Sequence, residues 1–113
     1  MKVTVLRPTS DVVLIVLVGE LDSVTAPHWS TVLHRELDSR PKVVVFDLGA
    51  VSFFGVAALR VLRLAAKRAQ RLAVEVNVIY RDRTPVHASL LAGGLTPIFP
   101  PFRTIAGAPF GGG

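Results

Sequence analysis

Seven consecutive apolar residues, VVLIVLV at positions 12–18, form the stretch that decides the fold class. A strand with one solvated face alternates apolar and polar residues, whereas a run that is apolar at every position is typical of a strand covered on both faces. A membrane-spanning helix needs about 20 apolar residues, so this run is too short to cross a membrane. The sequence therefore predicts a buried strand over residues 12–18.

Strand and helix patterns alternate on both sides of this run. Residues 3–5 predict an edge strand, joined to the buried strand by the turn RPTSD at residues 7–11 and paired with it antiparallel. Further strands of the central kind are expected at residues 43–46 and 74–80. Helices are expected between the capping residues 22–25 and the stop at 39–41, over about 59–71, and from the Thr84 cap to Gly93-Gly94.

The order of these elements is β-β-α-β-α-β-α, with residues 98–102 as a candidate for one more short segment. Strands separated by helices are joined by right-handed crossovers and pair parallel. We therefore predict an α/β fold in which helices pack on a mixed, mostly parallel sheet of four or five strands.

Composition limits the class of protein. The chain has 113 residues, 13 Lys and Arg against 8 Asp and Glu, and no cysteine. This length predicts one domain over residues 1–102, followed by a flexible Pro/Gly-rich tail over residues 103–113. The absence of cysteine excludes a disulfide framework and a thiolate metal site. Because no signal-peptide pattern opens the sequence, we expect a cytoplasmic protein without a membrane partner.

Two loops are expected at the carboxyl ends of the parallel strands, where open α/β sheets place their sites. They are GELDS at residues 19–23 and LGAVSFFG at residues 48–55. The second loop opens a helix whose free N–H groups favour an anion, but it has no Lys and no spaced glycines, so it is not a phosphate-binding P-loop. Phe53 and Phe54 make this loop apolar, which suits either protein contact or burial in the core.

A family resemblance rests on these residues. The motifs are Gly19-Glu20-Leu21-Asp22, Ala26-Pro27, Val45-Phe46-Asp47-Leu48, Val51, Phe53, Leu59, Gly94-Leu95 and Ile98-Phe99. With this order and spacing, the chain from about Asp11 to Phe102 resembles the STAS domain of bacterial anti-sigma factor antagonists. The resemblance implies a non-enzymatic protein that binds a protein kinase-like anti-sigma factor and so relieves the inhibition of a sigma factor in transcription.

The resemblance also implies a phosphorylation switch that this sequence lacks. In the family, the loop entering the second helix reads Asp-Ser-Ser/Thr-Gly-Leu, and the partner kinase phosphorylates one of the hydroxyls. Here Gly55, Val56 and Ala57 replace Asp-Ser-Ser. Val56 cannot carry the charge of about −1.5 to −2 that a phosphate adds. Ser23, Thr25 and Ser52 lie on the same edge as substitute hydroxyls, although each is explained as a turn or capping residue.

Basic residues concentrate on the second predicted helix. Arg60, Arg63, Lys67 and Arg71 recur at helical spacing and form what we call the basic stripe, with Arg68 beside it and no acid from residue 60 to 71. The stripe is either an ordinary solvated face or a docking surface for an acidic partner; direct nucleic-acid binding ranks below both, because no aromatic residue is interleaved. The expected partner-contact residues are Asp22, Ser23, Phe54, Gly55, Val56, Ala57, Arg60, Arg63 and Lys67.

Other functions stay open as alternatives. The chain could be a STAS interaction subunit of a larger signalling assembly, a homodimer, or a small-molecule or nucleotide binder with a pocket near Asp22 and Gly55. The three histidines, His28, His34 and His87, lack the spacing of metal ligands. Asp47 is tied to no base or nucleophile, and Trp29 is expected to pack. We therefore expect no catalytic residue, no metal and no cofactor.

Overall fold

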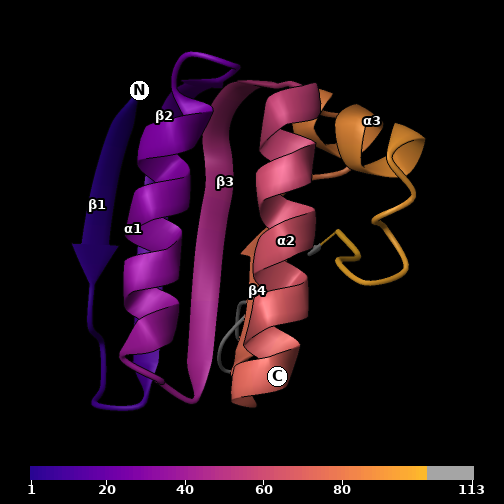
Figure 1. The fold of residues 1–113 in the computed structure, drawn as a ribbon. Coiled ribbons are helices and arrows are strands. Elements are labelled where there is room, and N and C mark those ends of the chain that lie inside the picture. The colour runs from indigo at the N-terminus through magenta and orange to yellow at the C-terminus, as the bar shows by residue number, and fades with distance from the viewer. Residues whose placement is uncertain (102–113) are drawn as a thin grey trace, which may run out of the picture.

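The computed structural model describes residues 1–101 (Figure 1). Its elements, in chain order, are β1 (Lys2–Leu6), β2 (Val12–Leu21), α1 (Ala26–Asp38), β3 (Val43–Phe54), α2 (Val56–Leu72), β4 (Glu75–Ile79) and α3 (Pro85–Ala92). The predicted order is confirmed. The expected tail over residues 103–113, and Phe102 of the additional short segment, lie outside the described residues.

The four strands form one sheet in the order β1-β2-β3-β4. β1 pairs antiparallel with β2, whereas β2 with β3 and β3 with β4 pair parallel. The parallel pairs are joined through α1 and α2, which lie side by side over the same face of the sheet (Figure 1). The α/β fold with a mixed, mostly parallel sheet is therefore confirmed, with four strands in the described part of the chain.

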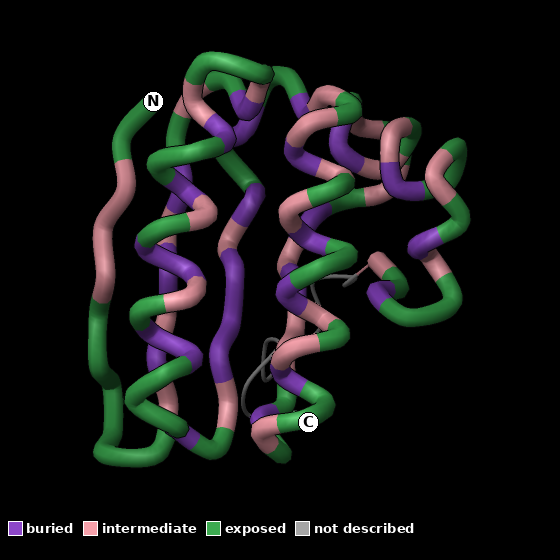
Figure 2. The backbone as a smooth tube through the Cα atoms, viewed as in Figure 1, coloured by how far each residue is buried: buried purple, intermediate pink, exposed green. Residues whose placement is uncertain are grey.

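Burial along β2 differs from the expectation that this strand is covered on both faces. Val13, Ile15 and Leu17 are buried, but Val12, Leu14 and Val16 on the opposite face are only half-buried, and Val18 is 43% exposed (Figure 2). The reason is that both crossover helices cover the same face, so the strand alternates in burial although its sequence does not alternate in polarity.

The core between the helices and the sheet is organised around Trp29 of α1. Its side chain is completely buried and makes edge-to-face contacts with Phe46 and Phe54 of β3, at ring-centroid distances of 5.9 and 5.8 Å. Such aromatic pairs add about 0.5–1.5 kcal/mol beyond the burial of their area. Packing is therefore the role of Trp29, as the sequence predicts.

The strands extend further than the sequence predicts. β2 continues to Leu21 and β3 to Phe54, so most of the two expected loops is paired strand, with Gly19 opposite Val51 and Leu21 opposite Phe54. Gly19 has a φ of +113° and lies at a shift in the register. Its conformation, which suits glycine, lets the ladder continue past an irregularity.

β4 corrects a second expectation. Its apolar residues predict a central strand, but β4 is at the edge of the sheet and pairs with β3 alone. Val78 is nevertheless buried and Val76 half-buried, because α2 and the segment after α3 pack beside this strand. An edge strand whose face is covered by helices and loops can therefore be as rich in apolar residues as a central strand.

Candidate functional site

The end of β2 and the start of α2 meet at one edge of the sheet. The backbone N–H of Gly55 donates to the carbonyl of Leu21 at 2.9 Å, and Leu21 pairs with Phe54. The loop 22–25 and the N-terminus of α2 are therefore neighbours, as the sequence predicts for the carboxyl ends of parallel strands.

Asp22 and Thr25 hold the loop that precedes α1. One carboxylate oxygen of Asp22 accepts the backbone N–H groups of Val24 and Thr25 at 2.9 and 3.0 Å. The hydrogen bond from Thr25 is the largest cause that lowers the pKa of Asp22. The Thr25 hydroxyl donates to the carbonyl of Glu20 at 2.8 Å. Both side chains are therefore engaged in shaping the loop, while Ser23 is exposed beside them.

Gly55 lies directly under an aromatic ring. A Cβ atom at this position would be 2.9 Å from Cε2 of Phe53, closer than Cβ atoms approach other groups. Because the ring lies against Gly55, the Asp that the resemblance to STAS domains implies at this position would require Phe53 to move. The ring of Phe53 thus occupies the space that a side chain at position 55 would need, which agrees with the presence of glycine there.

Three exposed apolar residues belong to the segments that end or begin at this edge, and we call them the apolar rim: Val24, Phe53 and Val56. They are 82, 48 and 72% exposed. Phe54, expected among the partner-contact residues, is instead buried against Trp29. The alternation of β3 explains this correction: neighbouring residues of a strand point to opposite faces, so only one of the two phenylalanines can be in the core.

The N-terminus of α2 carries no side-chain cap. Gly55 is the N-cap residue, and the first turn contains no acidic residue. Its unsatisfied N–H groups give this end a partial positive charge. The edge therefore combines apolar side chains with a weakly positive helix end, and positions 55–57 offer no hydroxyl.

The basic stripe is exposed, but its neighbour Arg68 is not part of the same surface. Arg60, Arg63, Lys67 and Arg71 are exposed. Arg68 turns toward α1, where it donates to Nδ1 of His34 at 3.0 Å and pairs with Asp38. Arg68 thus links the two helices, because its place on the helix wheel is on the side that packs against α1.

The burial of His34, next to Arg68, is expected to make stability depend on pH. Burial, and then the charge of Arg68, lower the pKa of His34, while Asp38 opposes this effect. Since an arginine donates only, Nδ1 of His34 accepts, and the neutral ring carries its proton on Nε2. The folded chain therefore binds this proton less readily than the unfolded chain.

We expect the free energy of unfolding to fall as the pH is lowered through about 6.5, the ordinary pKa of histidine, until the folded state also takes up the proton. His34→Gln keeps an acceptor for Arg68 and should flatten this part of the profile. The measurement is urea unfolding at a series of pH values between 5 and 8. Equal slopes for the variant and the wild-type chain would contradict the assignment.

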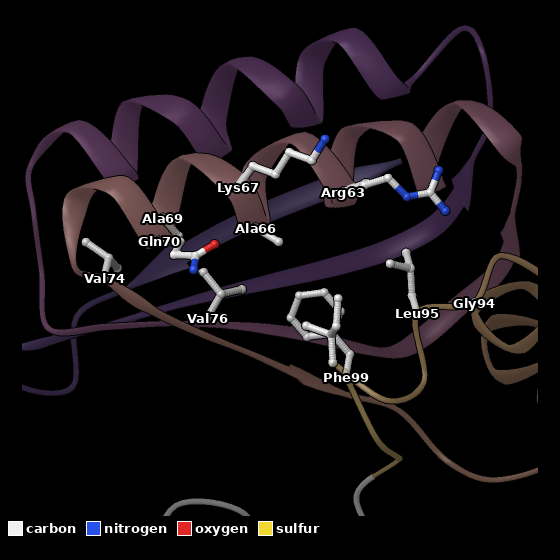
Figure 3. Close-up of a pocket in the computed structure, with 11 residues that line it drawn as sticks. Arg63, Ala66, Lys67, Ala69, Gln70, Val74, Val76, Gly94, Leu95 and Phe99 are labelled. Atoms are coloured by element: carbon white, nitrogen blue, oxygen red, sulfur yellow. The ribbon is translucent and has the colours of Figure 1, made fainter.

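The structure also contains a pocket that we did not expect from the sequence. The small-molecule alternative places a pocket near Asp22 and Gly55, but a pocket of about 640 Å³ lies between α2, β4 and residues 94–99 (Figure 3). Two alanines of α2, Ala66 and Ala69, are the signal that could have indicated it, because small residues on a packed helix face leave space.

Among residues 1–101, no three His, Asp or Glu side chains are grouped to hold a metal, and no helix has the length and hydropathy to cross a membrane.

Comparison with known proteins assigns the family. The STAS domain model matches residues 4–108, so the chain belongs to the STAS domain family. No curated protein sequence matches the chain significantly.

Solved structures agree with this assignment. An anti-sigma factor antagonist from Mycobacterium paratuberculosis is similar at 25% identity with a TM-score of 0.78, covering 93% of this chain and 89% of that one. The anti-sigma factor antagonist SpoIIAA in its unphosphorylated form has 16% identity, a TM-score of 0.76 and coverages of 90 and 89%. The phosphorylated form of the Bacillus cell fate determinant SpoIIAA has 14% identity, a TM-score of 0.69 and coverages of 90 and 92%. At these lower identities, the two SpoIIAA structures show a shared fold.

Proposed function

We propose that this protein is an anti-sigma factor antagonist. It binds a kinase-like anti-sigma factor in the cytoplasm and so relieves the inhibition of a sigma factor. The bound surface combines the apolar rim with Asp22, Ser23, Gly55, Ala57, Arg60, Arg63 and Lys67. The observation that carries the proposal is the apolar rim at the N-terminus of α2, at the position that the family uses for its switch.

The chemistry of this surface favours a protein partner. Exposed apolar side chains that are grouped at one edge mark interaction sites, because contact with a partner removes them from water. Arg60 and the adjoining cations of the basic stripe continue the surface along α2, where they would complement an acidic partner and increase the rate of association. The apolar rim would supply most of the affinity, and the basic stripe would orient the partner.

We further propose that phosphorylation at the usual position does not control this binding. Gly55, Val56 and Ala57 carry no hydroxyl. Of the substitute hydroxyls, that of Thr25 donates to the carbonyl of Glu20 and that of Ser52 to the carbonyl of Gly19. Binding would then follow the amounts of the two proteins rather than the state of a kinase.

The test uses the purified full chain and purified anti-sigma factor kinases from the source bacterium. We expect one of them to bind in titration calorimetry and to release its sigma factor when the chain is added. With labelled ATP, the bound kinase should transfer no phosphate to the chain, whereas an antagonist with the intact motif, run in parallel with its own kinase, should be labelled.

The outcomes separate the two parts of the proposal. Failure of every anti-sigma factor to bind would contradict the antagonist role. Binding accompanied by label on Ser23, Thr25 or Ser52 would keep the role but overturn the absence of a phosphorylation switch.

A further inference from the structure

The pocket between α2 and β4 has an apolar interior and a basic mouth. Alanines of α2, valines at and before β4, and Leu95, Ile98 and Phe99 supply the apolar lining. Arg63, Lys67 and Gln70 are its charged and amide-bearing members, and no acidic residue of the described chain lines it. In Figure 3, Arg63 and Lys67 extend from α2 above the apolar side chains.

Close approach of the chain after α3 builds one wall of this pocket. A Cβ atom at Gly93 would be 3.2 Å from both methyl groups of Leu59, so glycine lets the turn pack tightly on α2. Gly94 has a φ of +71°, a conformation that favours glycine. The turn therefore places Leu95 and Phe99 opposite the alanines of α2. Because the alanine side chains are small, the space between the two sides stays open as the pocket.

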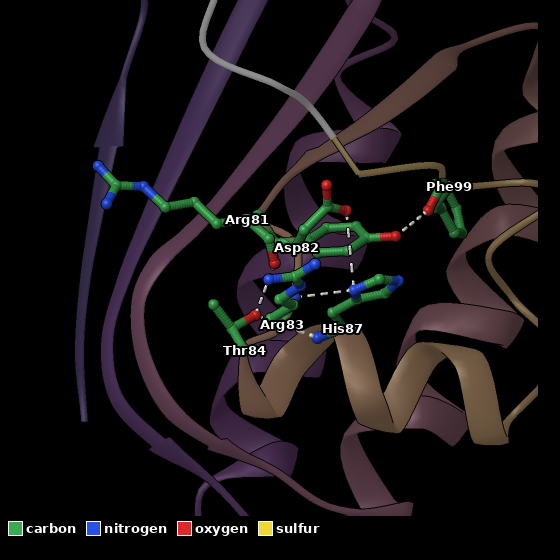
Figure 4. Close-up of polar contacts among 7 residues, drawn as sticks. Arg81, Asp82, Arg83, Thr84, His87 and Phe99 are labelled. Carbon is green, nitrogen blue, oxygen red and sulfur yellow. Dashed lines mark hydrogen bonds and ion pairs between the residues drawn. The ribbon is translucent and has the colours of Figure 1, made fainter.

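Hydrogen bonds hold this wall in place. The N–H of Leu95 donates to Leu90 at 2.9 Å, and the N–H of Phe99 to Leu95 at 2.8 Å. The hydroxyl of Tyr80, just after β4, donates to the carbonyl of Phe99 (Figure 4). Burial raises the pKa of Tyr80 to about 12, so this hydroxyl stays protonated and able to donate even in the alkaline range. The pocket is thus preformed rather than a gap between loose segments.

The two cations at the mouth are available to an anion. Arg63 donates one N–H to the carbonyl of Gly93 at 2.7 Å, which anchors its guanidinium across the turn and leaves its other donors free to bind an anion. Lys67 lies one turn further along α2. Among residues 1–101, neither Arg63 nor Lys67 takes part in an ion pair.

We propose that this pocket binds an anionic amphiphile, specifically a medium-chain carboxylic acid. Its chain lies against Ala66, Val76 and Phe99, and its carboxylate between Arg63 and Lys67. The volume is in the range of pockets for small organic ligands, about 300–1,000 Å³. A nucleotide fits less well, because its sugar and phosphate groups would lose water against an interior with few hydrogen-bonding partners.

The experiment titrates the full chain with hexanoate, octanoate and decanoate by calorimetry, with decanol as the uncharged probe. Affinity should rise about fourfold for each added methylene group, the value expected for transfer out of water. Decanol should bind about tenfold more weakly than decanoate, because it lacks the charge that Arg63 and Lys67 would meet. Amide shifts in NMR spectra should centre on Ala66, Val76 and Leu95.

Three variants locate the site. Lys67→Met keeps an apolar stem but removes the charge. It should weaken the binding of decanoate about tenfold without changing the binding of decanol. Arg71→Met removes a charge from the same helix outside the pocket, and should leave the affinities for decanoate and for decanol unchanged. Ala66→Phe fills the interior and should abolish binding.

Each contrary result overturns a defined part of the inference. No binding of decanoate at millimolar concentration would remove the ligand class, and equal binding of decanol would remove the anionic head. Retained binding in Ala66→Phe, or amide shifts confined to residues 53–57, would place the site elsewhere. Because this titration contains no anti-sigma factor, its failure is separate from a failure of the proposed antagonist role.

Discussion

Replacing Trp29 by alanine is expected to lower the free energy of unfolding by about 3–5 kcal/mol. The side chain is completely buried and contacts both Phe46 and Phe54 edge to face, so its removal leaves a cavity where α1 meets β3. Single domains are stable by about 5–15 kcal/mol, so this loss is a large fraction of the total.

Circular dichroism during urea unfolding measures this effect, since Trp29 is the only tryptophan and its fluorescence is lost in the variant. Trp29→Phe is the matched variant. It keeps an aromatic ring and removes an indole N–H that has no hydrogen-bond partner in the described structure, so it should cost less than half as much. A loss below about 1 kcal/mol for the alanine variant would show that the core closes around the missing ring.

Val56→Asp is expected to change partner binding and stability in opposite directions. A charge in the apolar rim should weaken binding of the anti-sigma factor by about 30-fold or more, the effect of losing a central contact residue. The same carboxylate would lie in the first turn of α2, where the helix end is positive, and should raise the free energy of unfolding by about 0.3–1 kcal/mol.

The measurements are titration calorimetry with the anti-sigma factor that binds the wild-type chain, and thermal unfolding of the free chain. Leu6→Asp is the control, because Leu6 is an exposed apolar residue at the end of β1, paired with Leu14 and outside the proposed surface. It should leave affinity near the wild-type value. Equal affinity of Val56→Asp and the wild-type chain would exclude the N-terminus of α2 from the interface.

Much of the fold could be predicted because local patterns and topology agree. Apolar runs, together with turn and stop signals between them, place the helices and strands of residues 1–101 in the right order. Thr84 illustrates this agreement, since its hydroxyl oxygen accepts the N–H of His87 at the start of α3 as its capping sequence predicts. The shared edge of residues 22–25 and the start of α2 follows from parallel pairing in the same way.

The candidate site was predicted less completely, because exposure depends on which face of a strand is covered. Adjacent Phe53 and Phe54 are equivalent in composition, yet one is in the apolar rim and the other in the core. Arg68 and Arg71 are both basic residues of one helix, but only Arg68 faces α1. The periodicity of the sequence shows which residues share a face of a helix or strand. It does not show which of these faces is covered, because that depends on the neighbouring element.

The sequence by itself determined the α/β class, the order of the elements, the resemblance to STAS domains and the missing hydroxyls at positions 55–57. These properties rest on residue identity and on spacing along the chain. The tertiary structure alone decided that both crossover helices cover one face, that β4 is an edge strand, and that a pocket opens between α2 and the turn after α3. It also decided that Glu36 of α1 is buried, with Arg7 at 2.8 Å. These properties depend on contacts between residues that are distant along the chain.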